Sequence, residues 1–107
     1  MEEFVKGDIV IIDFPFSSGK KKRRPALVFV NLKGEDLILF QVTSTKRINS
    51  IEIEEKDFLF GKLNVTSFVR IEKIFTLEKK KVLYLAGHLI EEKFIEIHES
   101  FLKLVNS

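Results

Sequence analysis

The sequence contains no cysteine, and only two prolines and five glycines interrupt its 107 residues. The absence of cysteine excludes disulfides, thiolate metal sites and cysteine nucleophiles, and it agrees with a reducing cytoplasm. No apolar run reaches the roughly 18 residues that a membrane-spanning helix needs, so no membrane partner is expected. The first residues, among them Glu2 and Glu3, are acidic and polar and do not resemble a secretory signal. We therefore expect a cytoplasmic protein.

The chain is long enough for one compact core, and we predict a single domain over residues 1–107. Its 45% hydrophobic and 32% charged residues are typical of a globular protein. The net charge is only +2, but the cations cluster at Lys20–Arg24, Lys46–Arg47 and Lys79–Lys81. Acidic residues gather instead in the segment after Leu89. This separation of charge predicts a basic face.

Short apolar runs rich in β-branched residues predict strands, and Pro15 and Gly87 predict the ends of the first and the last. The predicted strands are Ile9–Phe14, Pro25–Val30, Leu37–Val42, Ile51–Glu54, one or two within Ser67–Leu77, and Val82–Ala86. From Ile90 the apolar period becomes helical, with one stripe formed by Phe94, Ile97, Phe101, Leu104 and Val105. The pattern is mainly β (α+β) and predicts a small, strongly bent antiparallel sheet or open barrel with the helix packed across it.

A cationic segment separates the first two predicted strands. Lys20–Arg24 is a run of like charges that gains nothing from burial, so we predict a solvated loop from Phe14 to Pro25. Such a loop suits an anion such as nucleic acid, and it equally suits a charged turn that only keeps the protein in solution. Arg24 directly precedes Pro25, which presents its planar, bidentate guanidinium from a fixed point.

Hydroxyl residues follow the third predicted strand at Thr43, Ser44 and Thr45. They can hold a phosphate or a ribose, or they can satisfy backbone groups in a turn. His88 and His98 have no neighbouring ligands at metal-site spacing, so neither predicts a metal site, and His88 suits a capping or packing role. We expect no metal and no cofactor.

Taken together, these pieces resemble the MazF/PemK toxin family. The resemblance rests on Gly7–Val10, Arg24–Val28, Val42–Ser44 and Gly87–Leu89 with the acidic helix behind them, and it covers nearly the whole chain in order. It implies an SH3-like barrel of antiparallel strands with a C-terminal amphipathic helix, of the CcdB/MazF/PemK type, built as a homodimer.

The resemblance also implies a function. Members of this kind are the toxin component of type II toxin–antitoxin systems. They are metal-independent, sequence-selective endoribonucleases that cut single-stranded RNA, including mRNA, by attack of a 2′-hydroxyl. The cognate antitoxin covers the RNA groove with an acidic, partly disordered segment.

The family's site residues carry over to matching positions. Arg24 and Thr43 match catalytic residues, and the residues expected to bind RNA are Lys20, Lys21, Lys22, Arg23, Ser44 and Lys46. The loop before Arg24 is shorter and more basic than in many relatives, and it leaves the general base unassigned.

Two other functions remain open at this stage. The same barrel can serve as a non-catalytic module that grips RNA or inhibits a protein target, as the similar gyrase-poison toxins do. It can also be a structural interaction domain whose basic loop is only solubilising. Salt-dependent RNA binding without cleavage distinguishes the first of these from an enzyme.

Overall fold

The computed structural model describes residues 3–14 and 22–107, which form one antiparallel sheet and one α-helix. The strands are β1 (Asp8–Phe14), β2 (Lys22–Asn31), β3 (Asp36–Thr43), β4 (Ser50–Ile53), β5 (Phe58–Gly61), β6 (Ser67–Glu78) and β7 (Val82–Leu89). Two short 3-10 helices, η1 (Glu55–Asp57) and η2 (Lys79–Lys81), precede β5 and β7, and α1 spans Glu91–Val105. The order in the sheet is β4-β6-β3-β2-β1-β7-β5.

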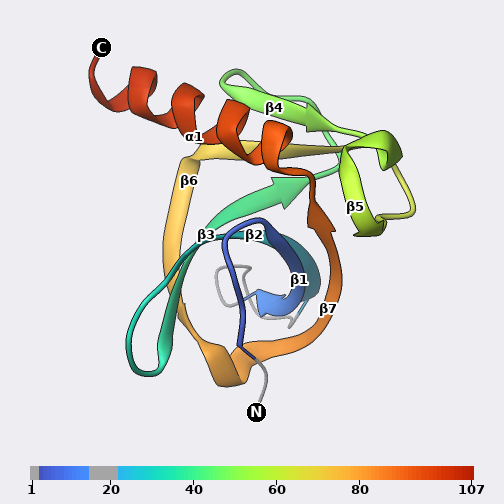
Figure 1. The fold of residues 1–107 in the computed structure, drawn as a ribbon, viewed down its shortest axis with the longest axis vertical. Helices are drawn as coiled ribbons and strands as arrows, with labels where there is room; N and C mark the ends of the chain where they lie inside the picture. Colours follow the sequence, from blue (N-terminus) through green and yellow to red (C-terminus); the bar gives the residue numbers. More distant parts are fainter. Residues whose placement is uncertain (1–2, 15–21) are drawn as a thin grey trace.

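The sheet curls into an open barrel in which β6 and β7 wrap around β1, β2 and β3 (Figure 1). The curl has a local cause in β6. Gln41 of β3 pairs with Arg70, but the preceding Phe40 pairs with Ile74, so β6 carries extra residues between these pairs. Such a bulge bends a strand and increases its twist. The prediction of a small, mainly β open barrel is therefore confirmed, with Ser67–Glu78 as one bent strand.

Strand alternation divides the core into two clusters on opposite faces of the sheet. The first cluster packs against α1 and contains Ile9, Leu27, Phe40, Val42, Ile53, Val69, Ile71, Leu89 and Ile97. The second fills the curl of the sheet and contains Phe4, Val10, Ile12, Ala26, Val28, Leu37, Leu39 and Leu77. Consequently, successive residues along β1, β2 and β3 belong to different clusters. Most of the length of these strands is therefore buried on both faces.

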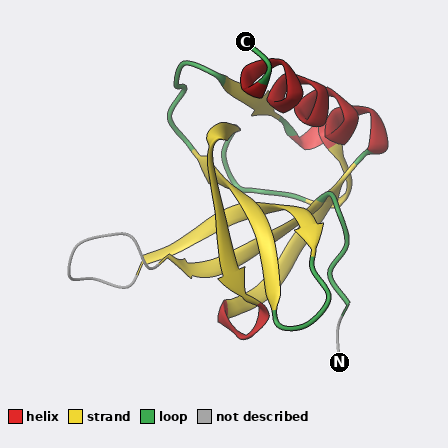
Figure 2. Ribbon diagram, turned by 90° about the vertical axis from the view of Figure 1, so that its left-hand side faces the viewer, coloured by secondary structure: helices red, strands yellow, loops and turns green. Residues whose placement is uncertain are grey.

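Helix α1 lies across one end of the barrel beside β4, as Figures 1 and 2 show. Phe94, Ile97, Phe101 and Leu104 face the first cluster as the predicted stripe requires, whereas Val105 is exposed. No helix in the described ranges is long and apolar enough to cross a membrane.

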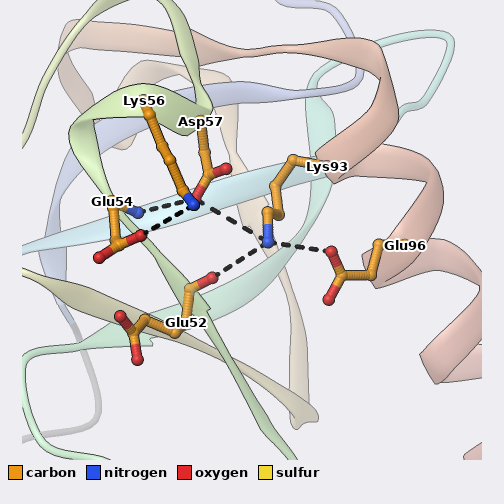
Figure 3. A network of polar contacts seen from close by, with 6 residues as sticks. All are labelled: Glu52, Glu54, Lys56, Asp57, Lys93 and Glu96. Atoms are coloured by element: carbon orange, nitrogen blue, oxygen red, sulfur yellow. Dashed lines mark hydrogen bonds and ion pairs between the residues drawn. The ribbon is translucent and has the colours of Figure 1, made fainter.

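Lys93 ties the start of α1 to β4 and η1 (Figure 3). Its ammonium donates to the carboxylate of Glu96 at 2.9 Å and to the carbonyl of Glu52 at 3.4 Å, and it lies 3.8 Å from Asp57. The carbonyl of Asp57 in turn accepts the N–H of Ile90 at 2.8 Å. Ile90 supplies no side-chain cap, and these contacts help to fix the start of the helix on the sheet.

The start of β2 differs from the prediction of a loop through Arg24. Lys22, Arg23 and Arg24 belong to the strand, and β2 pairs with the last residues of β1. Arg23 lies opposite Asp13, an opposite-charge pair that favours the sheet. Lys22 and Arg23 remain exposed, so a strand at this point requires no burial of like charges. Lys20 and Lys21 lie outside the described residues.

The predicted end of the last strand at Gly87 is wrong, because β7 continues to Leu89. Gly87 lets β5 approach β7 closely. A Cβ atom at this position would lie 2.7 Å from the carbonyl oxygen of Phe60 and 2.8 Å from the ring of Phe58. The glycine therefore permits β5 to pair closely with β7 and does not end the strand.

Candidate active site

Arg24 lies on β2, on the face of the sheet that carries the second core cluster. It pairs with Ile12 of β1, and its guanidinium carbon lies 5.6 Å from the centroid of the Phe14 ring. Its Nε is buried and has no hydrogen-bond partner. The side chain is thus half-buried against apolar groups at the end of the cluster, with donor capacity that the protein does not use.

Thr43 is the last residue of β3, on the strand next to Arg24. Ala26 of β2 pairs with Gln41 of β3, and extending this register along both strands brings Arg24 opposite Thr43. The Thr43 hydroxyl oxygen accepts the N–H of Thr45 at 3.2 Å. Thr43 therefore satisfies a backbone group in a turn, which is one of the two roles that the sequence left open. Because the oxygen is the acceptor, the hydroxyl hydrogen remains available to donate to a phosphate.

Arg70 of β6 shares this face of the sheet, and Glu72, which lies in the bulge of β6, contacts it. Arg70 pairs with Gln41 of β3, which places it diagonally from Thr43. Its Nη2 lies 3.5 Å from a carboxylate oxygen of Glu72, and its Nε is buried without a partner. The sequence alone does not single out this pair as part of the site. The available signal was alternation, since Arg70 and Glu72 alternate with the apolar Val69 and Ile71.

The two unpartnered Nε atoms indicate what the site can bind. Buried donors almost always have an acceptor, and exceptions often mark a site for an ion or a ligand. An oxyanion is the natural acceptor for a guanidinium, because it accepts two parallel hydrogen bonds from one fork. Arginines on β2 and β6, with a hydroxyl on β3 between them, can hold a phosphate, and Glu72 supplies an acceptor beside Arg70.

The residues expected to bind RNA lie around this site where the structure describes them. Lys22 and Arg23 are exposed at the start of β2, close in sequence to Arg24. Ser44 and Lys46 are exposed in the segment after β3. These positions place positive charge and a hydroxyl near Arg24 and Thr43, so a bound polyanion can contact them.

His88 has the packing role suggested by the sequence. Its Nδ1 lies 2.8 Å from an oxygen of the buried Asp8 carboxylate, and its ring stacks on Phe60. The other oxygen of that carboxylate accepts the N–H of Val5. His88 thus joins β7 to the start of β1, away from Arg24. Among the residues with described positions, no group of three or more His, Asp or Glu side chains is placed to hold a metal ion.

The fold and this site define a class: a curled antiparallel half-barrel with a C-terminal helix, bearing arginines and a threonine on one face. A family model described as PemK-like, MazF-like toxin of type II toxin–antitoxin system matches residues 5–105. The chain belongs to this toxin family, as the resemblance predicted. A search of curated protein sequences returns no match.

Solved structures show the same fold at low sequence identity. An endoribonuclease in complex with its cognate antitoxin, from a mycobacterial species, has a TM-score of 0.77 and 16% identity over 97% of this chain and 96% of that chain. The toxin MazF-mt6 from Mycobacterium tuberculosis has a TM-score of 0.74 and 16% identity over 92% and 96%. MazF from Deinococcus radiodurans has a TM-score of 0.68 and 20% identity over 95% and 96%.

Proposed function

We propose that this toxin is a metal-independent endoribonuclease that cuts single-stranded RNA, such as mRNA, at selected sequences. The observation that carries the proposal is the grouping of Arg24, Thr43 and Arg70 on one face, with two buried donors that lack acceptors and with Glu72 in contact with Arg70. Family membership supports it, and so do the structural relatives described as endoribonucleases. The two arginines supply the positive charge that many nucleases take from a metal ion.

In the proposed reaction, the ribose 2′-oxygen attacks the adjacent phosphorus. A bond forms between this oxygen and phosphorus, and the bond from phosphorus to the 5′-oxygen breaks. Glu72 takes the proton of the 2′-hydroxyl, the 5′-oxygen receives a proton from water, and the hydroxide that is left takes the proton from Glu72. The products are a 2′,3′-cyclic phosphate and a free 5′-hydroxyl.

Each remaining group acts on the charge that this reaction creates. Negative charge grows on the phosphoryl oxygens in the transition state, and Arg24 stabilises it with its unused donors. Thr43 donates its hydroxyl hydrogen to the same phosphate. Arg70 orients the carboxylate of Glu72, from which its Nη2 is 3.5 Å away. Arg24 does not serve as the acid, because a guanidinium gives up its proton poorly at neutral pH.

The proposed partners follow from the same surfaces. Exposed apolar side chains on β7, namely Leu83, Tyr84 and Leu85, support a homodimer. The basic residues around Arg24 suit the acidic, partly disordered segment of a cognate antitoxin. One structural relative, a mycobacterial endoribonuclease, was solved in complex with its cognate antitoxin, and another was solved as MazE–MazF from Deinococcus radiodurans. A monomeric mass in sedimentation would contradict the dimer. The proposed place of action is the cytoplasm, where mRNA is available.

Cleavage in the presence of EDTA tests the function directly. The purified protein is expected to cut single-stranded RNA in EDTA and to leave 2′,3′-cyclic phosphate ends. A single 2′-deoxynucleotide at the cut position is expected to block cutting without preventing binding, because the nucleophile is missing. RNA that stays intact in many sequence contexts would rule out the enzyme and favour a non-catalytic binding module.

Replacing Lys22 and Arg23 together with serine is expected to weaken RNA binding and to reduce its dependence on salt. Both side chains are exposed near the site, and each phosphate contact on single strands contributes about 0.7 to the slope of log K against log salt. The expected decrease in slope is therefore about 1.4. Fluorescence anisotropy with a deoxy-substituted RNA, repeated at several salt concentrations, measures it.

The matched control replaces Lys33 and Lys103 with serine. Both are exposed cations, but Lys33 lies in the turn between β2 and β3, far along β2 from Arg24, and Lys103 lies on α1. The control is expected to leave the slope unchanged. Equal slopes for all three proteins would mean that Lys22 and Arg23 only keep the protein in solution.

A further inference from the structure

Phe14 provides the ring on which the Arg24 guanidinium lies. The residues are on neighbouring strands, offset by one pair, because Ile12 is opposite Arg24 and Phe14 is opposite Lys22. The guanidinium carbon is 5.6 Å from the ring centroid, within the range at which a cation is attracted to an aromatic face. This contact holds the charged end of Arg24 without using any of its N–H donors.

The Phe14 ring is itself held from the other side of the barrel. Phe75 of β6 meets it edge to face, with centroids 6.1 Å apart and planes at 86°. Both rings pack against the second core cluster and are half-buried. The ring under Arg24 is therefore fixed by β6, the strand that also carries Arg70 and Glu72.

The sequence restricts the backbone of both members of this contact. The chain has two prolines, Pro15 and Pro25, and they directly follow Phe14 and Arg24. A residue before proline is confined largely to extended conformations, so both members lose little backbone freedom when the strands form. The local sequence, as well as packing, thus favours the geometry of the contact between Phe14 and Arg24.

The two arginines of the site are held in different ways. Arg70 is oriented by the carboxylate of Glu72, which partly neutralises its charge. Arg24 lies on a ring, and its Nε has no hydrogen-bond partner. A carboxylate in place of the ring would compete with phosphate for the same donors, whereas an aromatic face leaves the in-plane donors free.

We propose that Phe14 is a positioning residue that holds the Arg24 guanidinium in its catalytic orientation. The inference rests on the proposed RNA cleavage, for which Arg24 is the charge-stabilising group. Because misplacement of such a group by about 1 Å can cost up to 100-fold in rate, loss of the ring is expected to reduce turnover. Substrate affinity is expected to change little, since most of the phosphate contacts remain.

Single-turnover kinetics of Phe14→Leu, Phe14→Trp and Phe58→Leu test this role. Phe14→Leu keeps an apolar side chain but loses the aromatic face, so the cleavage rate at saturation is expected to fall about 10- to 100-fold while the half-saturating enzyme concentration stays near that of the wild type. Phe14→Trp restores the face and is expected to recover most of the rate. Phe58→Leu, at a half-buried phenylalanine of β5, is the control and is expected to cut normally.

The inference is overturned if Phe14→Leu cuts at the wild-type rate, or if Phe14→Trp loses as much activity as Phe14→Leu. A second measurement needs no variant. NMR relaxation of the buried Arg24 Nε–H in the wild-type protein is expected to give an order parameter near that of rigid backbone, about 0.85, and a value below about 0.6 would refute the contact. If the wild-type protein cuts no RNA, the proposed function fails, and comparing this order parameter between the wild type and Phe14→Leu still tests whether the ring holds Arg24.

Discussion

Arg24→Ala is expected to lower the rate of RNA cleavage by about 100- to 1000-fold, the range seen when one preorganised donor to a transition-state oxyanion is removed. The reason is local. Arg24 presents charge from a half-buried position beside apolar side chains, where electrostatic interactions are stronger than in water. Its loss leaves the phosphoryl oxygens with Thr43 and Arg70 alone. Single-turnover cleavage of a short labelled RNA measures the effect.

Arg23→Ala is the matched control, because it removes the same charge from the adjacent position. Arg23 is exposed, lies opposite Asp13 and points to the other face of β2 by strand alternation. It is expected to reduce binding modestly and to leave the rate at saturation unchanged. If both variants lose the same rate, the total charge of the segment matters and the position of Arg24 does not.

Arg24→Lys separates charge from shape. Lysine retains the positive charge but lacks the planar fork, and it donates to a phosphate as a point charge. It is expected to recover only a small part of the lost rate. Full activity of Arg24→Lys would contradict both the bidentate contact and the role given to the Phe14 ring.

Much of the fold was predictable because its strands and helix each have a clear apolar period. Ile9–Ile12 is buried on both faces and reads as a continuous apolar run, and the helical stripe from Phe94 to Leu104 faces the core. The start of β2 was not predictable in this way. Its cations form a strand because they pair with β1, and the spacing of apolar residues along the chain does not indicate that pairing. Likewise, Gly87 is typical of a break, although it is a point where β5 approaches β7 closely.

The site was only partly visible in the sequence for a related reason. Arg24 and Thr43 could be named because they stand in motifs that resemble the family. Arg70 and Glu72 lie in a strand whose register to β3 shifts between Phe40 and Gln41. Alternation with Val69 and Ile71 separates Arg70 from one core cluster, but only the pairing of β6 with β3 shows that it lies beside Thr43. The pair is therefore a finding of the structure.

Glu72→Gln is expected to reduce the cleavage rate by about 100- to 10,000-fold, the usual contribution of a general base. Glutamine keeps the size of the side chain and its ability to accept a hydrogen bond from Arg70, but it cannot take the proton of the 2′-hydroxyl. RNA affinity is expected to stay near that of the wild type or to rise slightly, because a negative charge beside the phosphate is removed. Anisotropy with a deoxy-substituted RNA and single-turnover cleavage measure the two quantities separately.

Glu52→Gln is the control that makes this result specific. Glu52 pairs with Phe68 of β6, two residues from Arg70 in a regular part of the ladder, so it projects to the same face of the sheet. Its side chain is exposed, and the backbone carbonyl that Lys93 contacts is unaffected by the substitution. A general base must be held against the reacting hydroxyl, and of these two carboxylates only Glu72 has an arginine of the site to hold it. Loss of cleavage in Glu52→Gln with full activity in Glu72→Gln would move the base to β4 and leave Arg70 as a phosphate contact.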